Sequence, residues 1–316
     1  MQTLLVTHPA FLQHETGPLH PERPARMRAI DAALAAPAFA TLRREEPPLR
    51  DDAEAAILLA HSYAYLERMR AVSMDHGRLP AQIDRDTVIS EGTWNAALRA
   101  VSAGLHAVDV VMDPASGIAN AFCHVRPPGH HARRDRAMGF CVFSTAAIAG
   151  LYARARHGAW RVAVIDFDVH HGNGTQDIFW ADAGMFYGST HQMPLFPGTG
   201  AASERGAGNI WNAPLRSGDD GAAFRAAFEG RILPALESFG PDLILISAGF
   251  DAHRDDPLAN LRLLEPDFAW ATDQIVGVAH RHCGGRVVSL LEGGYQLDAL
   301  ARSTAVHVEA LMRGAR

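Results

Sequence analysis

The most constraining feature of this chain is a set of short runs that are apolar on both faces. Two of them, VAVIDFDV at 162–169 and LILISAGF at 243–250, are rich in isoleucine, valine and leucine. Strands of this composition are typical of a parallel sheet that helices cover on both sides. Runs of this kind occur at 3–8, 118–125, 161–169, 185–191, 243–249 and 286–290.

Amphipathic stretches of helical length separate these runs. They lie at 22–35, 53–72, 90–112, 142–157, 220–239, 266–282 and 297–312. Strands that alternate with helices predict an α/β fold, here a single three-layer domain over residues 1–316. Ligands bind such sheets just beyond the carboxyl ends of the strands, so the polar residues that follow each run are the candidates for chemistry.

Composition excludes several classes of protein. Of the 316 residues, 48% are hydrophobic and 20% charged, which excludes a disordered or fibrous chain. The net charge of −6 provides no broad basic field, so we expect no nucleic-acid partner. No window approaches the roughly 18 apolar residues of a membrane span, so we expect no membrane partner either.

The cysteines and the first residues indicate a compartment. Cys123, Cys141 and Cys283 are too few for a disulfide framework and show no CxxC spacing. The opening residues, MQTLLVTHPAFL, lack the basic start of a signal peptide and predict a first strand instead. We therefore expect a reduced, cytoplasmic protein, and the sequence is compatible with a homo-oligomer.

Four of the apolar runs are followed by histidine, aspartate or tyrosine. The segments are 126–131 (RPPGHH), 166–174 (DFDVHHGNG), 249–253 (GFDAH) and 292–295 (EGGY). Since parallel strands all end at one edge of a sheet, we expect these side chains to meet there.

The segment after 161–165 predicts a metal site. In an extended chain Asp166, Asp168 and His170 share one face, and burying such a set is costly unless a cation compensates the charge. Asp168 and His170 offer two ligands and Asp251 a third from another strand end. Three protein ligands and an open position are typical of a catalytic zinc site with one ion per chain. Ordinary helix-capping residues are the alternative for each aspartate alone, and iron or cobalt are alternatives to zinc.

Two carboxylates weaken the metal as a Lewis acid, so such a site needs a separate general base. The tandem His130-His131 is a candidate for it, since Gly129 allows a tight turn before the pair. Tyr295 follows two glycines and is a candidate donor to the developing oxyanion. A structural histidine and a core or rim tyrosine are the competing interpretations.

The order and spacing of these motifs resemble the histone deacetylase superfamily, most closely the bacterial class II-like deacetylases and the acetylpolyamine amidohydrolases. The resemblance runs from His20 to the C-terminal helix. It implies an arginase-like fold with an eight-stranded parallel sheet. It also implies His131 as general base and then acid, His130 as its electrostatic partner, and Tyr295 as donor to the scissile carbonyl.

Further roles are implied by the same resemblance. Asp166 would orient His130, and Asn173 would face His131. A potassium ion would lie beside Asp166, Ser189 and Thr190, with Asp168 and His170 contributing to its site.

The resemblance also implies a narrow substrate tunnel. Gly139, Phe140 and Phe196 would form its walls around an acyl-lysine-like chain. Asp84 would be the rim carboxylate that holds the substrate backbone, and Asp86 competes with it for this role.

The leading hypothesis is a zinc amidohydrolase that deacetylates an N-acetylated amine, either acetyl-lysine in proteins or peptides or an acetylpolyamine. A binuclear manganese ureohydrolase is the first alternative, because 251–255 (DAHRD) mimics the Asp-Ala-His-x-Asp motif of arginases. A non-catalytic acyl-lysine-binding module is the second.

Overall fold

The computed structural model describes residues 1–315, and within them a central sheet has eight strands, all parallel. The strand order is β2-β1-β5-β10-β9-β6-β7-β8. The strands span β1 Gln2–Val6, β2 Arg43–Glu45, β5 Ile118–Cys123, β6 Val162–Asp166, β7 Met185–Gln192, β8 Ile210–Leu215, β9 Leu243–Ala248 and β10 Val287–Leu291. The predicted three-layer α/β fold with an eight-stranded parallel sheet is therefore confirmed.

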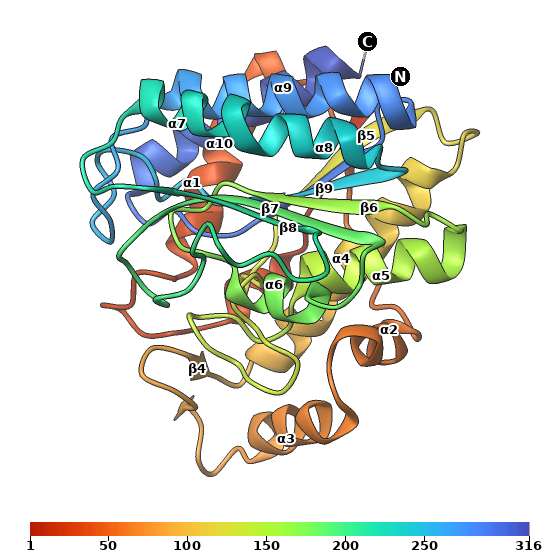
Figure 1. The fold of residues 1–316 in the computed structure, drawn as a ribbon. Coiled ribbons are helices and arrows are strands. Elements are labelled where there is room, and N and C mark those ends of the chain that lie inside the picture. Colours follow the sequence, from red (N-terminus) through yellow and green to blue (C-terminus); the bar gives the residue numbers. More distant parts are fainter. Residues whose placement is uncertain (316) are drawn as a thin grey trace.

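Helices cover both faces of the sheet, as Figure 1 shows. One layer consists of α1 Ala25–Leu34, α7 Gly221–Ala227, α8 Leu233–Phe239, α9 Glu265–Cys283 and α10 Leu297–Gly314. The opposite layer consists of α2 Ala53–Ala60, α3 Tyr63–Met74, α4 Thr93–Met112, α5 Thr145–His157 and α6 Asn173–Phe179. Between residues 1 and 315 no helix is long and apolar enough to cross a membrane.

The six predicted strands are all present, and the two that the apolar runs missed are the edge strands. Strand β2 has the sequence RRE with no buried residue, and β8 contains Pro214 and a half-buried Trp211. Edge strands lack a neighbour on one side and so do not carry the two-faced apolar signature of the interior strands.

Two predicted helices are subdivided. The stretch 53–72 divides at Ser62, whose side chain accepts the Tyr65 N–H and so starts α3. The stretch 220–239 contains a π-helical turn at Phe228–Ile232 before α8. Pro234 at the start of α8 has no N–H to donate to the preceding turn, which accounts for the change of helix type.

Short elements complete the described chain. Two 3₁₀ turns lie at Pro9–Gln13 and Pro37–Phe39. Strands β3 Ala81–Gln82 and β4 Val88–Ile89 form a small antiparallel hairpin, which lies beside α3 in Figure 1.

Candidate active site

The predicted site residues follow four strands that are neighbours in the sheet, β5, β10, β9 and β6. The loop after β5 carries the tandem histidines, and the loop after β6 carries Asp168 and His170. Asp251 follows β9, and Tyr295 follows β10. Because all four strands are parallel, the loops that follow them meet at the carboxyl ends of the strands. This was predicted from the polar residues that follow the apolar runs.

The three predicted zinc ligands come together. Nδ1 of His170 lies 3.1 Å from Oδ1 of Asp168 and 3.0 Å from Oδ2 of Asp251. One donor atom of each residue lies within 4.8 Å of the other two. Backbone groups hold the remaining carboxylate oxygens, since Gly293 N–H donates to Asp168 Oδ2 and Val169 N–H to Asp251 Oδ1. The oxygens near His170 are thus oriented toward a common point.

This set fits a divalent cation. Both carboxylates are completely buried, and the His170 side chain is 12% exposed. Burial, together with the charge of Asp168, raises the pKa of Asp251 to about 7. A cation between the groups would relieve this cost, and two carboxylate oxygens with an imidazole nitrogen suit a zinc-type ion.

Two glycines of the motifs make room for these carboxylates. A Cβ at Gly249 would lie 2.1 Å from Asp168 Oδ2, and a Cβ at Gly293 would lie 2.2 Å from Asp251 Oδ2. Neither distance is compatible with a side chain, so the close approach of backbone to carboxylate requires glycine at both positions.

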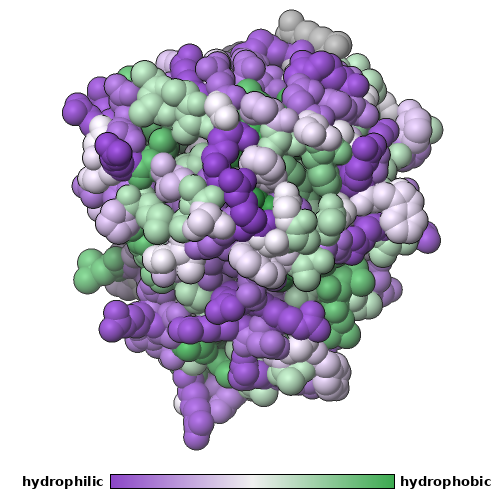
Figure 2. All heavy atoms as spheres, viewed as in Figure 1, coloured by the Kyte–Doolittle hydropathy of each residue, from purple (hydrophilic) through white to green (hydrophobic). Residues whose placement is uncertain are grey.

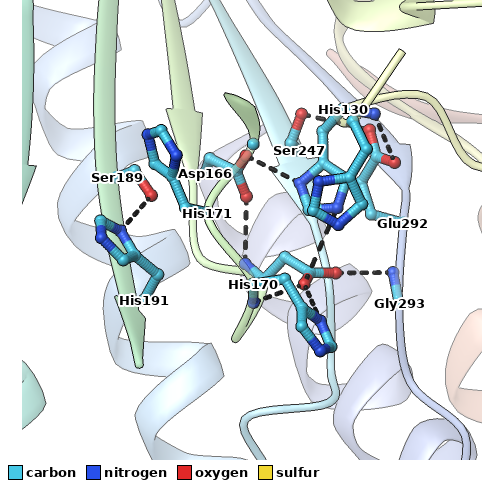
Figure 3. A network of polar contacts seen from close by, with 12 residues as sticks. His130, Asp166, His170, His171, Ser189, His191, Ser247, Glu292 and Gly293 are labelled. Carbon is cyan, nitrogen blue, oxygen red and sulfur yellow. Dashed lines mark hydrogen bonds and ion pairs between the residues drawn. The ribbon is translucent and has the colours of Figure 1, made fainter. Parts of the chain in front are cut away.

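The tandem histidines have different partners. Nδ1 of His130 lies 3.0 Å from Asp166 Oδ2, a pair visible in Figure 3. Nδ1 of His131 lies 2.9 Å from Asn173 Oδ1. Since the amide nitrogen of Asn173 donates to the sulfur of Met138, its oxygen faces His131 as acceptor. This arrangement assigns the proton of His131 to Nδ1 and leaves Nε2 as the free base.

The local charges act on the two imidazoles in opposite directions. Burial lowers the pKa of His131, and the positive charge of His130 lowers it further. Burial also opposes protonation of His130, but Asp168 and Asp166 outweigh it and raise its pKa. The ring centroids are only 4.0 Å apart, so the pair shares one electrostatic environment.

Glu292 is a buried residue to which the sequence interpretation assigned no role. Its Oε2 accepts the N–H groups of Gly129 and His130 at 2.7 and 3.1 Å, and its Oε1 accepts the Ser247 hydroxyl. Figure 3 shows Glu292 beside His130. His130, Cys141 and Glu292 also bring donor atoms within 4.8 Å, but these hydrogen bonds already occupy the Glu292 carboxylate. Its position directly after β10 was the signal that could have identified it.

A narrow cavity of about 240 Å³ leads to the ligand set. The predicted tunnel residues Gly139, Phe140 and Phe196 line it together with His131, His170 and Tyr295. Phe140 has a φ of +67°, which is uncommon for a residue with a side chain. This backbone conformation places its ring 5.7 Å from that of Tyr295.

The two candidate rim carboxylates occupy different places. Asp86 lines the narrow cavity, whereas Asp84 lines only the wider hollow outside it. Oδ1 of Asp84 accepts the Asp86 N–H at 2.9 Å and so shapes the turn. The structure therefore favours Asp86 over Asp84 at the tunnel, since only Asp86 lines the narrow cavity.

Tyr295 is held from two directions. The Asp256 carboxylate accepts its N–H at 2.7 Å, and the guanidinium of Arg26 lies 5.0 Å from its ring centroid. Burial, followed by the charge of Asp251, raises the pKa of the phenol well above its usual range. The hydroxyl therefore keeps its proton and can donate a hydrogen bond into the cavity.

Three of the residues predicted to hold potassium, Asp166, Ser189 and Thr190, lie on β6 and β7, and the other two, Asp168 and His170, lie in the loop after β6. Asp166 and Ser189 are register partners across these strands. The Ser189 hydroxyl lies 2.9 Å from Nδ1 of His191, as Figure 3 shows. The Thr190 hydroxyl is buried and has no hydrogen-bond partner among the described residues.

The arginase-like motif does not assemble a second metal centre. Nδ1 of His253 accepts the Asp255 N–H, and Nε2 lies 3.5 Å from Glu265. His253 therefore faces away from the ligand set, and no potential ligand group in residues 1–315 includes it. This geometry does not favour the binuclear ureohydrolase.

Comparison with known proteins agrees with the geometry. The histone deacetylase domain model matches residues 20–311. An uncharacterized protein of Synechocystis sp. is 42% identical over 305 residues, which cover 96% of this chain and 97% of the relative. The histone deacetylase-like amidohydrolase of Pseudomonas aeruginosa is 39% identical over 283 residues, covering 87% of this chain and 72% of the relative.

A solved structure shows the same fold. The crystal structure of the HDA15 HD domain matches with a TM-score of 0.90 at 33% identity, covering 98% of this chain and 88% of that one. The fold, the site and these matches define an amide hydrolase. The chain belongs to the histone deacetylase family, whose members are generally metal-dependent. The predicted family is confirmed.

Proposed function

We propose that this hydrolase removes the acetyl group from an N-acetylated amine, with one zinc ion held by Asp168, His170 and Asp251. The observation that carries the proposal is that a three-ligand set, a free imidazole base and a phenol donor surround one narrow cavity. Bound there, zinc would polarise the scissile carbonyl and make water easier to deprotonate.

The chain's own groups have separate roles in the proposed reaction. Nε2 of His131 accepts the proton of the attacking water, since Nδ1 donates to Asn173. The same nitrogen then donates that proton to the leaving amine. The Tyr295 hydroxyl donates a hydrogen bond to the carbonyl oxygen as negative charge develops on it. Asp166 fixes the ring of His130 beside the base.

The cavity indicates the form of the substrate. Its volume of about 240 Å³ and its walls of Phe140, Phe196 and Leu258 suit a slender chain that ends in a small acyl group. Acetyl-lysine in a peptide or an acetylpolyamine presents such a chain. An acetylated amine is thus the proposed partner. The same hydrolysis would apply to an acetyl-lysine peptide and to an acetylpolyamine.

The proposal also includes a potassium ion near Asp166, Ser189 and Thr190. The complete burial of Asp166 and the unpartnered Thr190 hydroxyl, judged within residues 1–315, support it. Activity measured in KCl and in NaCl at equal ionic strength tests this part. Equal rates, with no potassium found by elemental analysis, would contradict it.

The decisive experiment is a turnover panel with the zinc-loaded protein. Acetate release is measured from acetyl-lysine peptides, free acetyl-lysine and acetylated polyamines. We expect turnover by the wild-type protein and loss of most of it in His131→Ala and Tyr295→Phe, each with its zinc retained. If the zinc-loaded wild-type protein releases acetate from none of these amines, the proposed function is wrong.

A further inference from the structure

A second, wider hollow opens beside the narrow cavity. Its volume is about 680 Å³, and it shares Asp86 and Phe196 with the cavity. The two spaces are therefore adjacent, with these two side chains at their boundary. A substrate whose acetylated arm enters the narrow cavity has the rest of its structure next to this hollow.

The floor of the hollow is apolar and its rim is basic. Met69, Val72 and Met138 contribute apolar surface. Arg68, Arg85 and Arg136 line the same hollow, from α3, the β3–β4 hairpin and the loop after the tandem histidines. Figure 2 shows a band of hydrophilic residues across the lower part of the molecule, with apolar residues beside it, where α3 and the hairpin lie in Figure 1.

The arginines are not neutralised by the protein. The Arg85 and Arg136 guanidinium groups form no ion pair or side-chain hydrogen bond with any residue the structure describes. Arg68 donates to the backbone oxygen of Asp135, a neutral acceptor, and lies 5.2 Å from the Tyr65 ring centroid. Its position is thus fixed, and it forms no ion pair with any residue the structure describes.

Two carboxylates share the hollow but do not cancel this charge. Asp84 accepts the Asp86 N–H within the turn, and Asp86 lies at the boundary with the narrow cavity. Three guanidinium groups face two carboxylates, so the hollow has a net positive charge on a chain whose net charge is −6. Guanidinium groups pair well with carboxylates, often through two parallel hydrogen bonds.

Resting on the proposed deacetylase function, we propose that the preferred substrate is an acetyl-lysine peptide with acidic residues next to the acetylated side chain. The three arginines attract the acidic side chains, and the apolar floor accepts a neighbouring hydrophobic residue. The same charge repels a polyamine, whose remaining nitrogens are cationic. The hollow thus selects among substrates that the narrow cavity accepts equally.

The test uses three peptides that differ only in the residues flanking the acetyl-lysine, which are Glu, Gln or Lys. We expect kcat/KM to decrease in that order, by about threefold per step, the size of an exposed ion pair. The difference between the Glu and Lys peptides should shrink in about 0.5 M NaCl, because salt screens exposed charges.

Matched variants locate the effect. Arg85→Gln and Arg136→Gln should each lower kcat/KM for the Glu peptide by about two- to threefold and leave the Gln peptide unchanged. Arg156→Gln is the control. Arg156 is an exposed arginine near the end of α5, which leads into the amino end of β6, whereas the active site follows the carboxyl ends of the strands. Arg156→Gln should change neither value.

The outcomes separate the two proposals. If the Gln peptide is hydrolysed and the three peptides react at equal rates, the inference is overturned and the deacetylase function stands. A preference for the Lys peptide, or an equal effect of Arg156→Gln, also overturns it. If no peptide is hydrolysed by the zinc-loaded protein, the proposed function fails and the inference with it.

Discussion

The contact between Gly139 and the His131 ring allows a test of how closely the proposed base is positioned. A Cβ at residue 139 would lie 2.4 Å from Cδ2 of His131, whereas carbon atoms in contact are about 3.5 Å apart. Gly139→Ala therefore forces the imidazole to move by about 1 Å, and a displacement of that size costs roughly 10²-fold in kcat. The φ of +56° adds about 1 kcal/mol of backbone strain for alanine.

Gly158→Ala is the matched control for the strain. Gly158 has a φ of +68°, and among the described residues no atom lies within 4 Å of the point where a Cβ would stand. Gly158→Ala should lose about 1 kcal/mol of stability, which is about 2 °C in Tm for a chain of this size, and Gly139→Ala should lose more, because its Cβ also meets the His131 ring. Only Gly139→Ala should lose activity, measured as acetate release from an acetyl-lysine peptide under saturating substrate. A Gly139→Ala protein with kcat within about twofold of wild type would refute the reasoning.

Three further predictions concern the metal, acid stability and Glu292. Asp251→Asn removes one anionic ligand, so bound zinc should fall from one per chain toward zero in elemental analysis; full occupancy would contradict the assignment. Burial lowers the pKa of His61 to about 4, so the folded state binds fewer protons than the unfolded state below pH 6.5, and stability falls as pH decreases. The stability lost through His61 approaches about 3 kcal/mol by pH 4. In His61→Gln, the free energy of unfolding measured in urea should therefore depend less on pH between 6.5 and 4. An unchanged pH dependence would contradict the prediction for His61. Glu292→Leu leaves the N–H groups of Gly129 and His130 buried without an acceptor, and each should cost about 1–3 kcal/mol of stability. Glu292→Gln keeps an acceptor oxygen and should lose less stability. Equal Tm values for the two variants would show that the side-chain oxygen does not hold the loop that carries His130.

The interior of the sheet could be predicted from the sequence because its strands are buried on both sides. Strands β6 and β9 have no exposed residue, so their composition alone distinguishes them from surface segments. The edge strands β2 and β8 depend on backbone hydrogen bonds to a single neighbouring strand, and side-chain composition indicates little about such pairing. Register, which decides that Asp166 lies opposite Ser189, was likewise not readable from composition.

The ligand set was predictable for a different reason. Asp168 and His170 follow directly after the buried strand β6, and this position beyond a strand end identified them, although the structure places both in a bend and not in extended chain. Asp84 and Asp86 have the same spacing and also lie in a bend, but they follow the short hairpin strand β3 and not a buried strand of the main sheet, so their position did not identify which one faces the tunnel. Contacts between distant segments, such as Glu292 with Gly129, required the folded chain. The cytoplasmic location stays a prediction, for which cell fractionation is the measurement.

The placement of these groups separates the chemistry from the choice of substrate. The ligands, the base and its partners follow interior strands, and backbone N–H groups fix their carboxylates, so small changes elsewhere leave their geometry intact. The arginines of the wider hollow belong to α3, a short hairpin and a surface loop, where substitution costs little stability. Substrate preference in such a protein can therefore change through exposed charges alone, while the reaction at the sheet edge remains the same.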